Sequence, residues 1–314
     1  MSAGQKELVE TAGAPAVSPA TEMAVKAQVR RFYDSIGWRQ IGEGLYQNAR
    51  YEDLRPVSRS YLRRCHRRVG RFLPRRGTYF LDAGSGPIQY PEYLEYSQGY
   101  RYRVCLDLSR LALLEARQRI GDHGLYVVGD LADLPFQEQA FEGVVSLHTV
   151  HHLPLTEQEA AFRGFLRVLE PGGRSAVVYT WGDASPLMRV SAPLVRAANG
   201  LLAMLRRLRR GRDGEMAARG STEAEELLAA RGTHTFRHDY TWIRDTLADL
   251  PGLEIRVWRT ASTAFLRALI HRPLLGALWL RMLYQWEEWA PRLLGRLGQY
   301  PLIVFEKPGA ERLD

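Results

Sequence analysis

From residue 78 to residue 181 the chain alternates short apolar runs with amphipathic stretches. Short, nearly all-apolar strands that alternate with helices indicate a parallel sheet with helices on both faces. The predicted fold class is therefore α/β, with a doubly wound and mostly parallel sheet. The expected strands are TYFLDAG, YRVCLDLS, LYVVGD, FEGVVSLH and RSAVVYTW, and the first two expected helices are PEYLEYSQ and RLALLEARQRI.

The helix expected after the fourth strand has its own start and stop signals. Thr156 and Glu159 form the spacing of a capping box, and apolar residues on one face follow them. The sequence EPGG, which ends at Gly173, predicts the end of this helix, because proline cannot continue a helix and glycine tolerates a positive φ. A fifth strand is expected directly after it.

The flanking segments show other patterns, and together they predict five regions. Late apolar runs, LEIRVWRTAST and YPLIVFEKP, add two strands and bring the sheet to seven. The tryptophans of the last helical segment are expected to pack in the core or lid. The regions are a flexible tail at 1–21, an N-terminal helical cap at 22–75, a Rossmann-like core at 76–181, a helical lid insertion at 182–232, and the rest of the sheet at 233–314 with a helical insertion at 266–297.

Composition excludes several classes of protein. Hydrophobic residues make up 46% of the 314 residues and charged residues 25%, as in ordinary globular proteins. The net charge is +8, but all except three of the 43 basic residues are arginine, a skew typical of codon bias rather than of a nucleic-acid surface. Cys65 and Cys105 supply neither a disulfide framework nor a zinc site, which favours the cytoplasm. Charged residues interrupt the apolar stretch 265–286, which makes it a poor membrane span.

Candidate ligand-binding residues follow the predicted strands, where an open parallel sheet binds its ligands. Asp82 ends the first strand, with two glycines just beyond it, and Asp107 ends the second. Asp130 ends the third strand and His148 follows the fourth. Glycines let a ligand lie against the backbone, a carboxylate can accept both ribose hydroxyls, and Asp82 adds a negative charge that suits a cationic ligand.

Phosphate-binding loops fit this stretch poorly. The dinucleotide fingerprint GxGxxG would need glycine where the chain has Gln89, and Pro87 removes an N–H group that would bind phosphate. The chain also lacks the GxxxxGK[ST] loop of nucleotide triphosphatases. The loop therefore suits a nucleoside better than a pyrophosphate.

Five motifs in series resemble the class I S-adenosylmethionine-dependent methyltransferases, especially the small-molecule branch that includes ubiquinone and menaquinone methyltransferases. They are FLDAGSGP, VCLDLS, GDLADLPF, FEGVVSLHTVHHLP and LRVLEPGG, and they cover about residues 78–181. One departure is Ile88, which stands where the family's loop often has a third glycine.

The resemblance implies S-adenosyl-L-methionine as cofactor and assigns roles to individual residues. The loop would line the methionine and ribose part of the cofactor, and Asp107 would bind the ribose hydroxyls. His148 would lie near the sulfonium, where it or His151 would serve as base, unless the histidine cluster only shapes the pocket. From the N-terminal helices, Tyr33 and Tyr46 would lie near the methyl group, or only pack. The remaining implied contacts are Asp82, Ala83, Gly84, Ser85 and Gly86 in the loop, with Leu108, Asp130 and Leu131 around the adenine.

The hypothesis from the sequence is a cytoplasmic methyltransferase that acts on an apolar or aromatic small molecule by SN2 transfer without a metal. Its rivals are RNA methylation, prompted by the net charge, and a non-catalytic protein of the same fold that binds a cofactor or a partner. Oxygen, nitrogen and carbon acceptors stay open. Nucleic acid is disfavoured as a partner, the protein is expected to be a monomer or homodimer, and a lipophilic acceptor or a peripheral membrane contact through 266–297 stays open.

Overall fold

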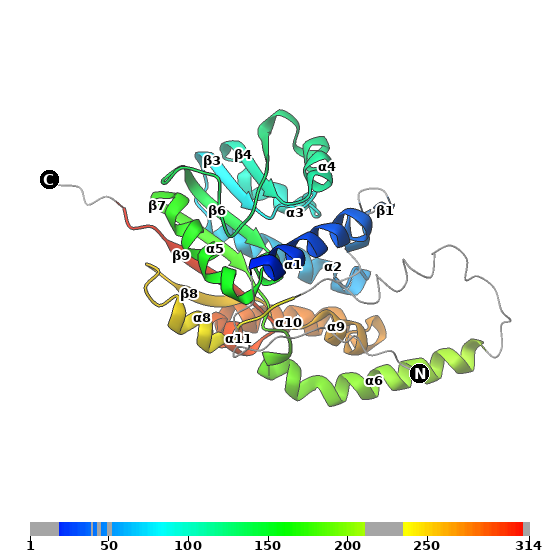
Figure 1. Ribbon diagram of the computed structural model, residues 1–314. Coiled ribbons are helices and arrows are strands. Elements are labelled where there is room, and N and C mark those ends of the chain that lie inside the picture. The colour runs from blue at the N-terminus through cyan, green and yellow to red at the C-terminus, as the bar shows by residue number, and fades with distance from the viewer. Residues whose placement is uncertain (1–18, 39, 43–44, 49–51, 211–234, 310–314) are drawn as a thin grey trace.

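The computed structural model describes residues 19–38, 40–42, 45–48, 52–210 and 235–309. Its centre is a seven-stranded sheet in the order β5–β4–β3–β6–β7–β9–β8 (Figure 1). Strands β3 to β7 pair in parallel, and β9 pairs antiparallel with β7 and β8. The predicted doubly wound fold is confirmed. The strands are β3 (Gly77–Ala83), β4 (Tyr100–Asp107), β5 (Gly124–Val128), β6 (Phe141–Leu147), β7 (Leu169–Val178), β8 (Glu254–Arg259) and β9 (Tyr300–Glu306).

Helices cover both faces of the sheet and bury an apolar core on each. One core takes its helical side chains from α2, α3, α4, α9 and α10, and the other from α5 and α8. The central strands contribute alternate side chains to the two cores, which explains their nearly continuous apolar sequences. The covering helices are α2 (Pro56–Val69), α3 (Pro91–Leu94), α4 (Arg110–Ile120), α5 (Leu155–Val168), α8 (Tyr240–Thr246), α9 (Thr263–Leu269), α10 (Gly276–Trp289) and α11 (Pro291–Leu297).

The N-terminal region is a mixed cap rather than a purely helical one. Helix α1 (Pro19–Phe32) begins inside the segment predicted as a tail, continues as a π-helical turn (Tyr33–Gly37), and is followed by a small antiparallel pair, β1 (Gln40–Gly42) and β2 (Leu45–Tyr46). Lys26 fixes α1 over the sheet edge, because its ammonium lies 2.5 Å from carboxylates of both Asp130 and Glu157. These are long-range contacts that no local pattern predicts.

Two details expected around α5 are wrong. Thr156 does not cap the helix, since Pro154 occupies the N-cap position and the Thr156 hydroxyl donates a hydrogen bond to Glu22 of α1. The strand expected after EPGG also starts elsewhere: α5 ends at Val168, just before EPGG as predicted, but β7 begins at Leu169 and includes EPGG. A register shift against β6 accommodates these residues, with Gly172 at a φ of 83°.

The two insertions are helical where the structure describes them. Helix α6 (Pro186–Arg210) runs along one side of the molecule and contacts α9 (Figure 1). Thr222 and Glu225, whose spacing in the sequence also predicts a capping box, lie outside the described residues. Trp279, Trp286 and Trp289, expected to pack inside, are 56%, 56% and 87% exposed. No helix in the described ranges is long and apolar enough to cross a bilayer.

Candidate cofactor and acceptor site

A cavity of about 350 Å³ lies at the edge of the sheet where the parallel strands end. Strands β3, β4 and β6 end at this edge, and so does the start of β9 because that strand runs in the opposite direction. Residues from α1 and from the loop before α2 complete the wall. Predicted site residues in the lining are Tyr33, Asp82, Gly84, Ser85, Gly86, Asp107, Leu108, Leu131, His148 and His151.

Asp107 joins the glycine loop to the end of β4. One carboxylate oxygen accepts a hydrogen bond from the Gly86 N–H at 2.9 Å, and the other accepts from the Ser109 N–H at 2.8 Å. Burial raises the pKa of Asp107 to about 6, although both N–H groups oppose this shift. Each oxygen keeps a lone pair, so the ionised carboxylate can still accept the two hydroxyls of a ribose.

The glycines permit a close approach of ring and backbone. Gly84 has a φ of 76° and Gly86 a φ of 54°, in the left-handed region that glycine adopts freely. A Cβ atom at Gly86 would lie 2.9 Å from the Trp38 ring, so Trp38 closes over the loop. The Nε1 atom of Trp38 is buried and has no hydrogen-bond partner among the described residues, although the side chain lines the cavity. Trp38 lies in no recognisable binding motif, and its place in the cavity wall was not predicted.

Asp82 does not add the net negative charge expected from the sequence. Its carboxylate accepts hydrogen bonds from Nη2 and Nε of Arg103 at 2.5 and 3.2 Å, and both side chains are buried. Arg103 also donates to the carbonyl of Tyr93 at 2.6 Å. Arg103 therefore neutralises Asp82, whose evident role is to hold the end of β3 against β4. Ala83, the next residue, is fully buried and is absent from the lining.

Asp130 and Leu131, the predicted adenine contacts that follow β5, have different positions: only Leu131 lies in the cavity wall. Leu131 lines the cavity, as Leu108 does on the other side of Asp107. The carboxylate of Asp130 is outside the lining, where it binds Lys26 and accepts the Ala132 N–H at 2.9 Å. Leu108 and Leu131 thus provide apolar surfaces for a flat ring, and Asp130 anchors α1.

Tyr33 and the histidines meet at the other end of the cavity. The Tyr33 hydroxyl lies 2.9 Å from Nε2 of His152, and the Tyr33 ring stacks on Trp38. Nε2 of His148 and Nδ1 of His151 are buried and have no hydrogen-bond partner among the described residues. Burial and nearby positive charges lower the pKa of His148 to about 3, so this imidazole is neutral at neutral pH. A ring with such a low pKa is a weak base, but a neutral imidazole still has one nitrogen that can accept a hydrogen bond.

Tyr46 is placed behind the cavity rather than in its lining. It is fully buried, packs edge-on against Trp38, and its hydroxyl donates to Glu115 at 3.2 Å. Its contact with the ligand space is therefore indirect, through Trp38.

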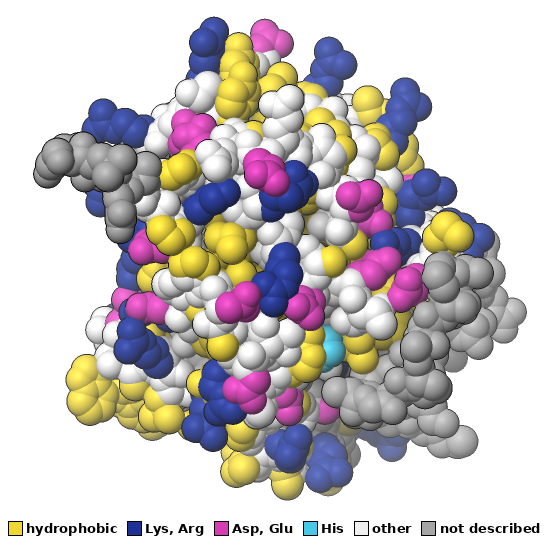
Figure 2. Space-filling view, turned by 60° about the vertical axis from the view of Figure 1, so that its left-hand side comes forward, with side chains coloured by type: hydrophobic (Ala, Val, Ile, Leu, Met, Phe, Trp, Pro, Cys, Tyr) yellow, Lys and Arg dark blue, Asp and Glu magenta, His cyan; other side chains and the backbone are white. Residues whose placement is uncertain are grey.

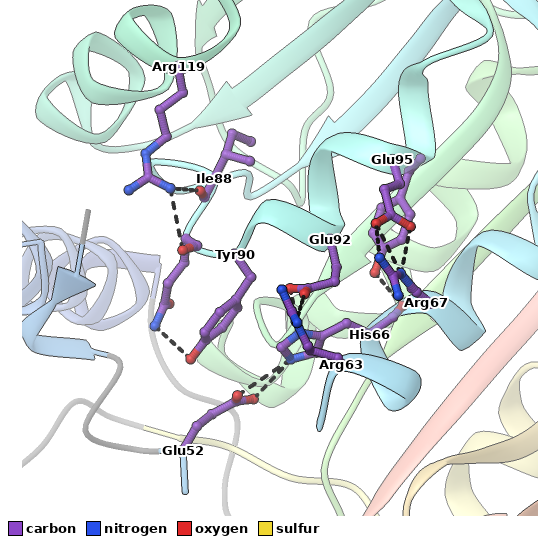
Figure 3. A network of polar contacts seen from close by, with 11 residues as sticks. Glu52, Arg63, His66, Arg67, Ile88, Tyr90, Glu92, Glu95 and Arg119 are labelled. Carbon is purple, nitrogen blue, oxygen red and sulfur yellow. Dashed lines mark hydrogen bonds and ion pairs between the residues drawn. The ribbon is translucent and has the colours of Figure 1, made fainter. Parts of the chain in front are cut away.

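A buried network beside the cavity was not predicted either (Figure 3). His66 lies between two carboxylates, with Nε2 3.4 Å from Glu52 and Nδ1 3.6 Å from Glu92. Burial opposes ionisation of Glu52, but the charges of His66 and Arg259 outweigh it and lower the pKa of Glu52 to about 2. Glu92 in turn accepts from Arg63 at 2.8 Å. The network keeps a charged carboxylate, Glu52, in the cavity wall.

Residues 81–177 match the family described as a methyltransferase domain. The central part of the chain is therefore similar to a methyltransferase domain. Three relatives align with it: a methyltransferase of Encephalitozoon cuniculi (36% identity, covering 29% of this chain and 41% of the relative), the ubiquinone/menaquinone biosynthesis C-methyltransferase of Roseobacter denitrificans (32%, 33% and 43%), and the probable tRNA methyltransferase 9B of Bos taurus (25%, 42% and 28%). The chain thus spans less than half the length of these relatives. The match to the quinone enzymes supports the resemblance inferred from the motifs.

A solved structure extends the similarity beyond the methyltransferase domain. Phosphoethanolamine N-methyltransferase 1 of Haemonchus contortus, in complex with phosphoethanolamine and S-adenosylhomocysteine, aligns with 95% of this chain at a TM-score of 0.52, and the alignment covers 52% of that protein. Their sequence identity is 11%, so the similarity concerns the fold alone.

The matched methyltransferase domain implies S-adenosylmethionine as cofactor, and the residues at the strand ends fit it. Asp107 keeps acceptor lone pairs, Leu108 and Leu131 offer apolar surfaces, and the indole N–H of Trp38 is an unused donor in the wall. No group of three or more His, Cys, Asp or Glu side chains suited to a metal ion occurs in the part of the chain that the structure describes.

Proposed function

We propose that this protein transfers a methyl group from S-adenosylmethionine to an apolar or aromatic small molecule. The observation that carries the proposal is the continuity of the cavity. A single space extends from Asp107 and Leu131, at the ends of β4 and β5, to His148 at the end of β6 and Tyr300 at the start of β9. The first end suits a nucleoside, and the second, lined by Tyr90, Tyr93 and Tyr300, suits a flat apolar acceptor.

The cofactor supplies an electrophilic methyl group on a sulfonium. The chain's own residues orient the reactants so that the acceptor's nucleophile approaches the methyl group in line, which accounts for most of the rate in such transfers. As the new bond to the methyl carbon forms, the carbon–sulfur bond breaks and its electron pair stays on sulfur. His148, which is neutral and whose Nε2 has no hydrogen-bond partner among the described residues, would accept a hydrogen bond from the acceptor, whose proton then passes to water.

Calorimetry tests the donor half of this proposal. S-adenosylmethionine and NAD would be titrated separately into the protein, and into Asp107→Ala and Asp245→Ala variants. Asp245 is an exposed control whose carboxylate pairs with Arg244 at 2.6 Å, outside the cavity lining. Micromolar binding of S-adenosylmethionine alone, lost only in Asp107→Ala, is the expected result. A preference for NAD would overturn the proposal. Turnover of quinones, phenols and amines would then distinguish an enzyme from a binding protein.

RNA methylation is the second candidate, because one relative is named as a tRNA methyltransferase. Two observations weigh against it. Lys and Arg alternate with Asp and Glu over the face in Figure 2 instead of forming a continuous basic patch. Many surface arginines are also paired, as Arg67 is with Glu95 and Arg163 with Asp249. Binding of tRNA whose affinity falls steeply with salt would favour RNA over a small molecule.

A further inference from the structure

A buried arginine lies at the end of the cavity assigned to the acceptor. Arg259 is the last residue of β8, lines the cavity, and is 1% exposed. It pairs across the sheet with Tyr300, and its guanidinium lies 4.5 Å from the centre of the Tyr300 ring and 5.1 Å from that of Trp258. Aromatic rings thus hold the planar guanidinium in place.

Only one of the three guanidinium nitrogens of Arg259 donates a hydrogen bond to a described residue. Nη2 donates to the Thr263 hydroxyl at 3.3 Å, whereas Nε and Nη1 have no hydrogen-bond partner among the described residues. A buried donor without an acceptor is costly, and a buried charge more so. Burial by itself would lower the pKa of Arg259, but interactions with Tyr300 and Glu52 raise it, so the side chain stays cationic. The guanidinium has two donor edges, Nε with Nη2 and Nη1 with Nη2, and each keeps a free N–H that can donate to an oxygen of a carboxylate or phosphate.

Glu52, the neighbouring acid, does not accept hydrogen bonds from the free N–H groups of Arg259. The charge of Glu52 helps to raise the pKa of Arg259, but the short contact of Glu52 is with His66, at 3.4 Å. Within the described residues, no ion pair joins Glu52 to Arg259. Glu52 contributes a favourable charge but accepts no hydrogen bond from Nε or Nη1 of Arg259.

From these contacts we infer that Arg259 binds an anionic group, a carboxylate or a phosphate, on the acceptor molecule. This inference rests on the proposed methyl transfer, and it narrows the substrate class to small apolar or aromatic acids and phosphate esters. The sheet order supports the acceptor over the cofactor as the source of the anion. Arg259 is on β8, five strand spacings or about 24 Å from β4, where Asp107 lies. His148, at the end of β6, contacts Trp258 beside Arg259.

Matched ligands test the inference without requiring turnover. The protein saturated with S-adenosylhomocysteine would be titrated with 4-hydroxybenzoate, its neutral analogue 4-hydroxybenzamide, phenyl phosphate and inorganic phosphate. We expect the acids to bind at least about tenfold more tightly than the amide. Arg259→Met should abolish this preference and Arg259→Lys should weaken it, because lysine keeps the charge but loses the fork. Arg256→Met is the control, since Arg256 lies on the same strand and pairs with Glu254 at 2.5 Å outside the cavity lining.

The outcomes separate four cases. An unchanged melting temperature in Arg259→Met supports a binding role. If the arginine served only to stabilise the fold, its removal would lower the melting temperature. Equal affinity for acid and amide in the wild type overturns the inference. Weaker S-adenosylhomocysteine binding in Arg259→Met also overturns it, since the anion would then be the cofactor's own carboxylate. Absence of S-adenosylhomocysteine binding in the wild type overturns the proposed function itself.

Discussion

Arg103 and Asp82 form a buried ion pair between β4 and β3, with Nη2 and Oδ2 2.5 Å apart. The acid that precedes the glycine loop therefore carries no free charge toward the cavity. The pair instead fixes the end of β3, from which the loop leaves, and Arg103 ties the same strand end to the backbone of α3 through Tyr93.

Removing only the arginine should be strongly destabilising. Arg103→Met leaves Asp82 as a buried carboxylate without a partner, and we expect a loss of about 3–5 kcal/mol in the free energy of unfolding. The double variant Asp82→Asn with Arg103→Met should recover most of this loss. Urea denaturation measures both. A single variant that loses less than about 1 kcal/mol would show that the pair is dispensable.

Cofactor affinity should depend on pH through Asp107. Burial raises the pKa of this carboxyl to about 6, so it is mostly protonated at pH 5 and ionised at pH 7.5. Only the ionised form accepts two ribose hydroxyls. If only that form binds, S-adenosylmethionine should bind roughly tenfold more weakly at pH 5 than at pH 7.5. Calorimetry at several pH values, with Asp107→Asn as a variant that cannot titrate, checks this. The same pH profile in both proteins would exclude Asp107 as its source.

Stability should fall in mild acid because of His148. Its pKa is about 3 in the folded protein and about 6.5 when unfolded, so below pH 6.5 the unfolded chain binds a proton that the folded protein excludes. Lowering the pH from 6.5 to 5 should cost about 2 kcal/mol through this group. His148→Asn should reduce the slope, and asparagine also tolerates the φ of 57° at this position. Thermal melts from pH 5 to 7.5 measure the difference, and parallel slopes for the two proteins would contradict it.

A methyl group added to the glycine loop should disturb the cavity wall. Gly86→Ala places a Cβ 2.9 Å from the Trp38 ring at a φ of 54°, and we expect a loss of about 1–2 kcal/mol in stability with weaker cofactor binding. Gly200→Ala is the matched control. Gly200 lies in α6 with no atom within 4 Å of an added Cβ, so alanine there should stabilise the protein by up to about 1 kcal/mol. Unchanged cofactor affinity in Gly86→Ala would indicate that Trp38 is free to move.

Sequence patterns predicted the strands because buried parallel strands have a simple local signature. The same patterns placed Asp107 and His148 at strand ends, since strand direction determines which ends meet. The structure brings both to the cavity, where their roles as ligand contacts stay predictions. Ile88 shows how a departure from the family pattern is accommodated: it adopts a φ of 55°, the conformation glycine would take freely, while its side chain is buried in the core.

Other features depend on contacts between distant segments, which no local pattern reveals. Asp130 resembles a ligand contact in sequence, but Lys26, 104 residues earlier, binds its carboxylate. Trp38 and Arg259 reach the cavity from segments whose own sequences carry no binding motif. A buried arginine in a strand is a signal that could have identified Arg259, because a charged residue inside an otherwise apolar strand needs a partner or a ligand.

The direction of β9 has a consequence for how this fold can diversify. Because β9 is antiparallel to β8, the segment 260–299 leaves the sheet at Arg259 and returns at Tyr300, two residues paired with each other beside the acceptor end of the cavity. The segment is thus an insertion whose two ends lie next to each other in the sheet. Exchanging it would remodel what surrounds the acceptor and leave β3, β4 and β5 intact, which makes it the natural unit for recombining substrate range among proteins with this sheet.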